Sequence, residues 1–173
     1  YTAALISIHF GINIIWGIVM GAIVAGIIAF LFEYFSMNIK GDEYILTSFV
    51  FQMVVFEVLM QWTSLTRGSY GLNAIPRPSI FGIVLNDLFS FFILAFVITF
   101  AIAIFLDYLA NSYFGIELRG LRDGERAMKS LGKNTNRLKL ITFTIGGVMA
   151  GIAGGLHASM IRFIYPGDFS VMM

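Results

Sequence analysis

Four long apolar stretches constrain what this chain can fold into more than any other feature. Residues 14–32 and 88–106 contain no charged side chain, 140–161 are glycine-rich and uncharged, and 44–62 carry one carboxylate among mostly apolar residues. A helix that spans a bilayer needs about 20 predominantly apolar residues. The sequence therefore predicts an all-α polytopic membrane protein with four complete transmembrane helices.

The composition agrees with this fold class and excludes several others. Of the 173 residues, 58% are hydrophobic and 12% are charged, whereas soluble domains average about 25% charged residues. The formal net charge is +1 and cysteine is absent. We therefore do not expect intrinsic disorder, a nucleic-acid partner, structural disulfides or thiolate metal sites. We expect the lipid bilayer to surround the chain.

The two ends of the sequence look like interruptions of a longer membrane domain. Residues 1–8 read as the last turns of a further, partial apolar helix, and 170–173 end without a polar tail. We interpret 1–173 as a single transmembrane domain that is truncated at both ends.

The distribution of basic residues predicts the orientation of the spans. Segment 107–139 holds seven of the eleven Lys and Arg residues, and short loops rich in these residues stay in the cytoplasm. Because each span crosses the membrane once, segments 63–87 and 163–173 then lie outside and segment 36–43 lies inside. We expect a multi-pass protein of the cell membrane with 107–139 on its cytoplasmic side.

Small residues recur at four-residue spacing in the last span. Gly147, Gly151 and Gly155 form one column, and Gly146 and Gly154 belong to a neighbouring one. Helices in lipid associate through close backbone approach at small residues. We expect helix packing at Gly147, Gly151 and Gly155, with a flexible substrate path as the alternative.

One carboxylate, Glu57, lies well inside a predicted span. Gln52 precedes it by five residues and Gln61 follows it by four. Ionisable groups inside a membrane usually face a protein interior or a cavity. We expect a polar stripe that faces the protein interior, and Gln52 and Glu57 then serve either a structural role or a translocation path.

The sequence offers no catalytic or metal-binding constellation. His9 and His157 are the two histidines and show no metal-ligand spacing, and neither a nucleophile elbow nor a phosphate-binding glycine loop occurs. We expect no bound metal or cofactor and no enzymatic activity. Energy for transport would then come from a gradient or from another subunit.

The outer segment 63–87 is rich in turn-forming residues. Gly68 and Gly71 can adopt positive φ, and prolines flank Arg77 on both sides. Together with Arg67 this predicts a shaped loop with two cations. Docking of a partner and a simple ordered connection both remain open from the residues alone.

The inner segment has an amphipathic pattern. Leu118, Leu121, Met128 and Leu131 recur on one side of a predicted helix over 118–132, and most basic residues fall on other sides. Gly132 predicts its C-terminal stop. Such a helix suits a lipid surface and a groove in a partner protein equally well.

Two motifs resemble one transporter family. Residues 64–78 read SLTRGSYGLNAIPRP, which resembles the outer-loop signature SLTGGxxGLxxIPxP of the branched-chain amino acid permeases of ATP-binding cassette importers. Residues 119–132 read RGLRDGERAMKSLG and resemble that family's coupling segment, and 134–140 match the run that follows it. The glycine-rich span and 166–169 also agree in position.

The resemblance implies a permease subunit of the prokaryotic cytoplasmic membrane with further spans outside residues 1–173. Its partners would be a sister permease, two ATPase subunits that bind ATP, and an extracytoplasmic substrate-binding protein. The implied coupling residues are Leu118, Leu121, Arg122, Asp123, Glu125, Arg126, Met128, Leu131 and Gly132. The implied contacts for the binding protein are Arg67, Gly68, Gly71 and Arg77. Gln52 and Glu57 would lie near the path.

The sequence also departs from the family pattern. Arg67 stands where a glycine is usual, and 53–56 differ from the usual Glu-Ile-x-Arg-like stretch. The expected substrate is therefore a branched-chain amino acid or another small polar solute such as urea or an amide. The alternative function is an ion-coupled secondary transporter that uses Glu57.

Overall fold

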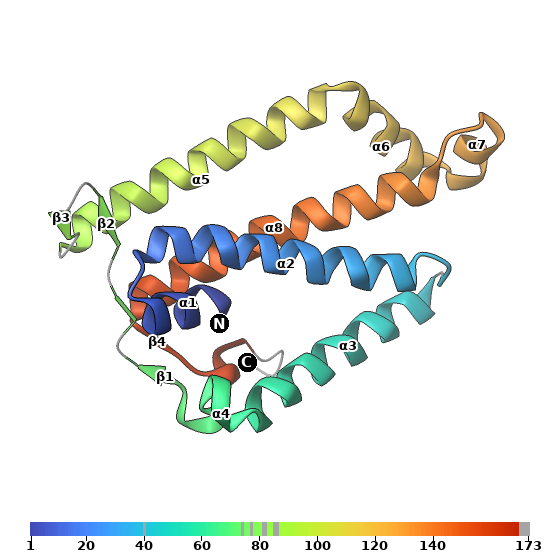
Figure 1. The fold of residues 1–173 in the computed structure, drawn as a ribbon. Coiled ribbons are helices and arrows are strands. Elements are labelled where there is room, and N and C mark those ends of the chain that lie inside the picture. The colour runs from blue at the N-terminus through green and yellow to red at the C-terminus, as the bar shows by residue number, and fades with distance from the viewer. Residues whose placement is uncertain (40, 74, 77, 81–82, 85–86, 170–173) are drawn as a thin grey trace.

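The computed structural model describes residues 1–39, 41–73, 75–76, 78–80, 83–84 and 87–169, and it consists mainly of helices (Figure 1). Four helices are long and apolar enough to cross a membrane, which confirms the predicted fold class. They are α2 (Ile14–Ser36), α3 (Asp42–Gln61), α5 (Leu88–Asn111) and α8 (Thr135–Ile161). Helices α2 and α5 begin at their predicted starts, whereas α3 and α8 begin earlier than predicted. Helices α2 and α5 also continue past their predicted ends.

The shorter elements gather at the two ends of these helices. At one end lie α1 (Thr2–Phe10), α4 (Thr63–Thr66), two 3₁₀ turns (Gly68–Tyr70 and Pro166–Phe169) and four short strands. The strands are β1 (Leu72–Asn73), β2 (Ser79–Ile80), β3 (Ile83–Val84) and β4 (Phe163–Ile164). At the other end lie α6 (Tyr113–Asp123) and α7 (Glu125–Ser130). We call these the strand end and the α6–α7 end.

Helices α2 and α8 run side by side through the centre of the fold (Figure 1). The residues of α2 that are buried recur every three or four positions, so they form one stripe along the helix. That stripe includes several small residues, and an added Cβ at Gly151 of α8 would lie 2.8 Å from the Cα of Ala22. Small side chains therefore let the two backbones approach closely.

Side-chain caps mark where these two central helices begin. The Oδ1 atom of Asn13 accepts a hydrogen bond from the backbone N–H of Ile15, and that of Asn134 accepts one from Arg137. Such caps satisfy backbone donors that have no partner inside the helix. The same residue type thus fixes the start of α2 and of α8.

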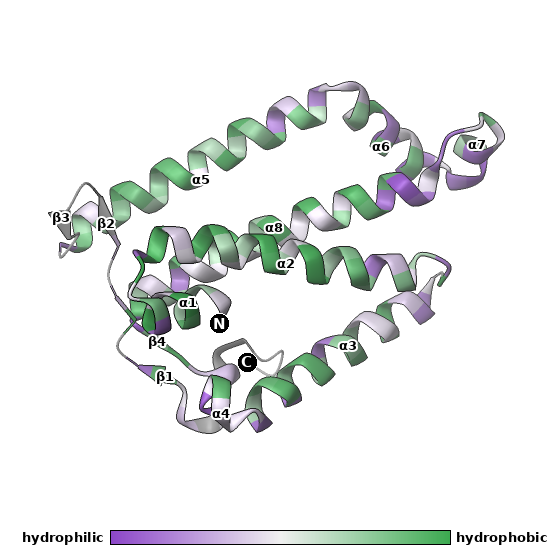
Figure 2. Cartoon of the chain, in the orientation of Figure 1, coloured by the Kyte–Doolittle hydropathy of each residue, from purple (hydrophilic) through white to green (hydrophobic). Residues whose placement is uncertain are grey.

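Helices α3 and α5 stand apart from this central pair. The structure describes every residue of both helices, and none of these residues is buried within the chain. Figure 2 shows α5 as almost uniformly hydrophobic, and its Phe92, Phe96 and Phe100 rings stack along one exposed side. Apolar side chains without partners within the chain are suited to lipid or to neighbouring helices.

At the strand end, β1 pairs with β4 in an antiparallel ladder that sets Leu72 opposite Ile164. This pairing brings the loop after α4 against the segment that follows α8. Buried Ile14, Ile75 and Ile164 form an apolar core beneath it, together with Ala4 of α1. The two segments that the charge distribution assigns to the outer side are therefore neighbours in space.

The prediction of one helix over 118–132 is wrong. The helix breaks at Gly124, whose extended backbone separates α6 from α7. The chain turns back there, so that the Sδ atom of Met128 would lie 2.8 Å from a Cβ added at Gly120. Met128 is consequently buried inside the hairpin while Leu131 is 75% exposed, so the expected apolar stripe does not form one continuous surface.

Candidate functional site

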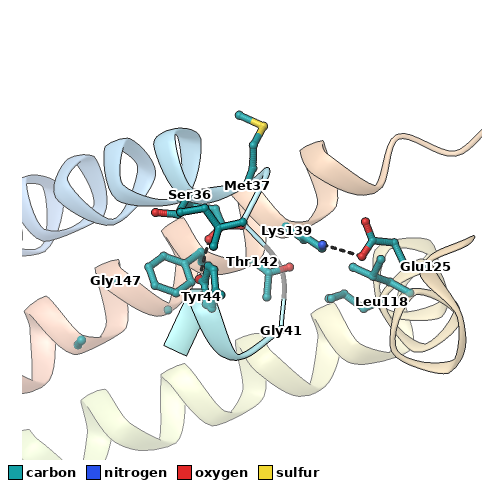
Figure 3. A pocket seen from close by; sticks show the side chains of 15 residues that line it. Ser36, Met37, Gly41, Tyr44, Leu118, Glu125, Lys139, Thr142 and Gly147 are labelled. Carbon is teal, nitrogen blue, oxygen red and sulfur yellow. Dashed lines mark hydrogen bonds and ion pairs between the residues drawn. The ribbon is translucent and has the colours of Figure 1, made fainter. Parts of the chain in front are cut away.

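A cavity of about 790 Å³ lies at the α6–α7 end, between the central helices and the α6–α7 hairpin. Figure 3 shows side chains from α2, α3, α6, α7 and α8 around it. Its lining residues are Glu33, Ser36, Met37, Ile39, Gly41, Tyr44, Leu118, Leu121, Glu125, Lys139, Thr142, Phe143, Gly146, Gly147 and Ala150. The cavity is therefore a space shared by the membrane helices and the predicted coupling segment.

A buried carboxylate, Glu33, forms part of the cavity wall. Glu33 is 3% exposed, and the Tyr44 hydroxyl donates a hydrogen bond of 2.8 Å to its Oε2 atom. The ring of Phe32 lies 6.2 Å from that of Tyr44 and 4.7 Å from that of Phe51. This hydrogen bond and these ring contacts join α2 to the first half of α3.

Glu33 was not among the residues predicted from the sequence. It directly follows Phe32, where the predicted span ends, and it precedes the predicted inner loop 36–43, so the prediction assigns it to neither. A signal was nevertheless present, because Gly26, Ala29, Glu33 and Ser36 recur at steps of three or four residues. That spacing places the carboxylate on the same stripe of α2 that is buried.

A second carboxylate of the cavity, Glu125, holds two lysines. The Nζ atom of Lys129 lies 2.8 Å from Oε1, and the Nζ atom of Lys139 lies 2.8 Å from Oε2. Hydrogen bonds from Lys129 and then from Lys139 lower the pKa of Glu125 from 4.5 to about 2. Because Lys139 belongs to α8, Glu125 ties α7 to the central pair of helices.

The turn after α7 is fixed by its glycine. Gly132 has a φ of 74°, its N–H donates to the carbonyl of Lys129, and the N–H of Lys133 donates to that of Met128. These two bonds form a Schellman motif, which satisfies carbonyls at the end of a helix. The side chain of Lys133 then pairs with Glu117 of α6 at 2.7 Å, which closes the hairpin.

Apart from Met128 and Gly132, the predicted coupling residues divide into two groups in this hairpin. Leu118, Leu121 and Glu125 line the cavity. Arg122, Asp123, Arg126 and Leu131 are exposed, with Arg122 and Asp123 paired at 3.0 Å. The hairpin therefore presents two leucines and Glu125 to the cavity and exposes mostly charged side chains elsewhere.

At the strand end, the predicted docking loop begins with two consecutive left-handed residues. Arg67 has a φ of 58° and Gly68 a φ of 54°, and Gly71 follows with 69°. The buried Thr66 hydroxyl lies 2.6 Å from the carbonyl oxygen of Leu59 and accepts a hydrogen bond from the N–H of Gly68. Arg77 lies outside the described residues.

The predicted polar stripe on α3 does not form as expected. Glu57 is exposed, accepts a hydrogen bond of 3.3 Å from Gln61, and shares a shallow groove with Phe49 and Met53. Gln52 is exposed but lies outside that groove. A five-residue step turns a helix by about 140°, so Gln52 and Glu57 point in different directions.

The glycines singled out on α8 face α2. A Cβ added at Gly147, Gly151 or Gly155 would meet Ala29, Ala22 or Ile18 respectively. A Cβ added at Gly146 or Gly154 would meet no described atom within 4 Å. Within this chain the two glycine columns thus differ, and the first one makes the close helix contact.

One helix connects the two ends of the molecule. Lys139 near the start of α8 pairs with Glu125, and Arg162 immediately after α8 donates a hydrogen bond of 3.4 Å to the carbonyl of Ile75 in the loop. Arg162 also has a left-handed φ of 62°. The hairpin and the loop are therefore attached to opposite ends of the same 27-residue helix.

The described part of the chain contains no group of three or more His, Cys, Asp or Glu side chains that could hold a metal ion. The carboxylates of the cavity and the hairpin are instead bound by Tyr44, by lysines or, for Asp123, by Arg122. The arrangement consists of a cavity, an exposed charged hairpin and a shaped loop. It is suited to binding and to transmitting motion along α8.

Comparisons with known proteins give a consistent result. The family described as "Branched-chain amino acid transport system / permease component" matches residues 1–173. The high-affinity branched-chain amino acid transport system permease proteins LivM of Salmonella typhimurium (strain LT2) and Escherichia coli (strain K12) are both 26% identical over 193 residues, which cover 98% of this chain and 45% of each relative.

A third organism supplies a further relative. The probable branched-chain amino acid transport permease protein LivM of Methanocaldococcus jannaschii is 27% identical over 153 residues, covering 86% of this chain and 43% of that protein. The chain thus spans less than half the length of these relatives. No solved structure matches it.

Proposed function

Because the chain belongs to the branched-chain amino acid transport permease family, we propose that it is part of the permease subunit of an ATP-binding cassette importer. Its substrate is a branched-chain amino acid or a related small polar solute such as urea or an amide. The family assignment confirms the resemblance that residues 64–78 and 119–132 predict. The chain is a multi-pass membrane protein with four apolar helices.

The attachment of the charged hairpin to α8 is the observation that carries this proposal. An importer powered by separate ATPase subunits needs a surface that meets those subunits and a rigid link from that surface into the membrane. The exposed Arg122 and Arg126 supply such a surface, and the Lys139–Glu125 pair supplies the link. Arginines are well suited to ion pairs at protein interfaces.

The proposed assembly contains one sister permease, two ATPase subunits and a substrate-binding protein. The ATPase subunits bind ATP and contact the α6–α7 hairpin in the cytoplasm. The binding protein contacts the loop around Arg67, Gly68 and Gly71, together with Arg77, at the strand end. Glu57 lies toward the translocation path that forms with the sister permease, and Gln52, which points in a different direction, lies near it. This chain binds no cofactor and performs no hydrolysis.

In this proposal, motion passes between the two docking surfaces through α8. Closure of the ATPase subunits displaces the hairpin, and Lys139 transmits that displacement to α8. Packed helices change between discrete arrangements rather than deforming continuously. The tight α2–α8 contact at Gly151 therefore makes the pair move as one body.

The proposal is tested by reversing charge on the hairpin in the complete transporter, reconstituted with its partners. The double variant Arg122→Glu/Arg126→Glu is expected to abolish ATP-driven uptake while the subunit still inserts and reaches the membrane. Arg137→Glu, an exposed residue in the first turn of α8, serves as the control and is expected to retain uptake. Normal uptake by a stably inserted double variant would contradict docking at this surface.

An ion-coupled secondary transporter is the second candidate because α3 carries Glu57 inside a membrane helix. The same reconstitution separates the two functions. Uptake that needs ATP and a binding protein supports the importer. Uptake that runs on an ion gradient without ATP, and that is lost in Glu57→Gln, would support the secondary transporter.

A further inference from the structure

We propose that the cavity at the α6–α7 end is a binding site for a small apolar molecule that carries an ammonium group, with the Glu33 carboxylate as its anionic partner. The site lies between α2, α3, α8 and the hairpin, away from the loop at the strand end. It does not include Glu57, and Glu33 has no part in the coupling described above.

The first argument is the burial of Glu33. A carboxylate that is removed from water is stabilised by a cation or by several hydrogen bonds. Glu33 is 3% exposed, and the hydrogen bond described for its carboxylate comes from the neutral Tyr44 hydroxyl. A carboxylate can accept about four hydrogen bonds. The ammonium of a ligand would supply both further donors and the compensating charge.

The second argument is the charge of the lining. Among the described residues that line the cavity, the charged ones are Glu33, Glu125 and Lys139. Lys139 is bound to Glu125 at 2.8 Å, so these two charges offset each other. The charge of Glu33 is left without a cation among the described lining residues. A ligand with one positive group would balance that charge.

The third argument is the chemistry and size of the remaining wall. Leu118, Leu121 and Phe143 provide apolar surface in the lining of the same cavity. Small-molecule sites are typically cavities of about 300–1,000 Å³ that are mostly apolar and contain a few polar groups. A volume of about 790 Å³ falls in this range and accommodates a branched aliphatic chain.

Two sources could provide this ligand chemistry. One is an amino acid in transit, whose α-ammonium and aliphatic side chain fit the description, and this identification rests on the proposed function. The other is a free organic amine that binds in the cavity between the membrane helices and the hairpin and is not transported. Recognition of the ammonium by Glu33 is common to both sources and does not depend on transport.

The test measures equilibrium binding by calorimetry to the complete transporter in nanodiscs, without ATP and without binding protein. Three ligands share one aliphatic chain: L-leucine, 3-methylbutylamine and 4-methylpentanoate. We expect 3-methylbutylamine to bind and 4-methylpentanoate not to bind. Binding of L-leucine as well would identify the amino acid in transit, and its absence would identify an organic amine.

The matched variants are Glu33→Gln and Glu57→Gln, which each remove one carboxylate from a membrane helix. Glu33→Gln should weaken binding of the amine by about tenfold or more, as expected when a hydrogen bond to a charged group is lost. Glu57→Gln should leave the affinity unchanged. Absent binding of both ammonium ligands, or equal affinity in wild type and Glu33→Gln, would overturn the proposal.

A second pair of variants covers the case in which Glu33→Gln fails to assemble. Gly146→Leu places a side chain into the cavity, whereas Gly154→Leu places one on α8 outside it, and neither added Cβ meets a described atom. Loss of amine binding in Gly146→Leu alone supports the site. Retained binding in Gly146→Leu overturns it. Neither result depends on uptake. The hairpin variants, which are assayed by uptake, therefore test the importer proposal independently of this binding site.

Discussion

The Nζ atom of Lys139 lies 2.8 Å from Oε2 of Glu125, and this ion pair joins the beginning of α8 to the first residue of α7. The same carboxylate also binds Lys129, four residues further along α7. One carboxylate thus makes a contact between helices and a contact within a helix. The two contacts can be removed separately.

Lys139→Gln is expected to weaken coupling between ATP hydrolysis and transport. Both side chains of the pair are 27–29% exposed, and partly exposed pairs contribute about 0.2–1 kcal/mol. We therefore expect substrate-stimulated ATPase activity to fall by a factor of about 1.4 to 5. Lys129→Gln removes an equal charge but leaves the link to α8. It should change activity less, and equal losses in both variants would contradict transmission through Lys139.

Acid is expected to release α7 from α8. Because the pKa of Glu125 lies at about 2 when it is paired, below its usual 4.5, the ionised carboxylate favours the docked hairpin above pH 4.5. That contribution is lost as the pH falls from 4.5 towards about 2. Spin labels at Ser130 and Arg137 should report a distance distribution that broadens over this interval.

Glu125→Gln provides the control for the acid experiment. A glutamine does not titrate, so its label distances should be broad at every pH between 2 and 4.5. Wild-type distances that stay unchanged down to pH 2 would show that Glu125 does not hold the hairpin.

The spans were predictable because hydropathy is a local property. Nineteen consecutive uncharged residues at 14–32 leave few alternatives to a membrane helix, and α2 indeed begins at Ile14. The Schellman turn at Gly132 was also predictable, since glycine is the residue that most readily adopts positive φ.

The hairpin and the cavity depend on contacts between distant residues, and the sequence pattern did not predict them. The hydrophobic spacing of Leu121 and Met128 is compatible with one continuous helix. Packing of Met128 against Gly120 favours a break at Gly124 instead. Glu33 became a candidate only when α2 was seen to continue past Phe32 and α3 to supply Tyr44.

Arg67→Gly is expected to stabilise the loop at the strand end. Arg67 holds a left-handed φ of 58°, which costs a non-glycine residue about 1–2 kcal/mol, and the greater freedom of an unfolded glycine reduces the net gain to about 0.5–1 kcal/mol. The resemblance to a family motif with glycine at this position agrees with that expectation. A higher Tm and slower proteolysis of 63–87 would be measured.

Arg162→Gly serves as the comparison for Arg67→Gly. Arg162 has a similar φ of 62°, but its guanidinium also donates a hydrogen bond to the carbonyl of Ile75. Its replacement should therefore gain less stability or lose some. A lower Tm for Arg67→Gly than for the wild type would contradict backbone strain at that residue.

Gly151→Ala is expected to destabilise the contact between α2 and α8. The new Cβ would lie 2.8 Å from the Cα of Ala22 and 2.8 Å from the Cβ of Ala25, so the helices must separate, at a cost of about 1–3 kcal/mol. Gly154→Ala adds the same methyl group three residues later, where no described atom lies within 4 Å. It should leave stability unchanged or raise it, because alanine favours a helix by about 1 kcal/mol over glycine. Thermal unfolding of the purified transporter distinguishes the two, and equal Tm values would show that the α2–α8 approach does not require a glycine at 151.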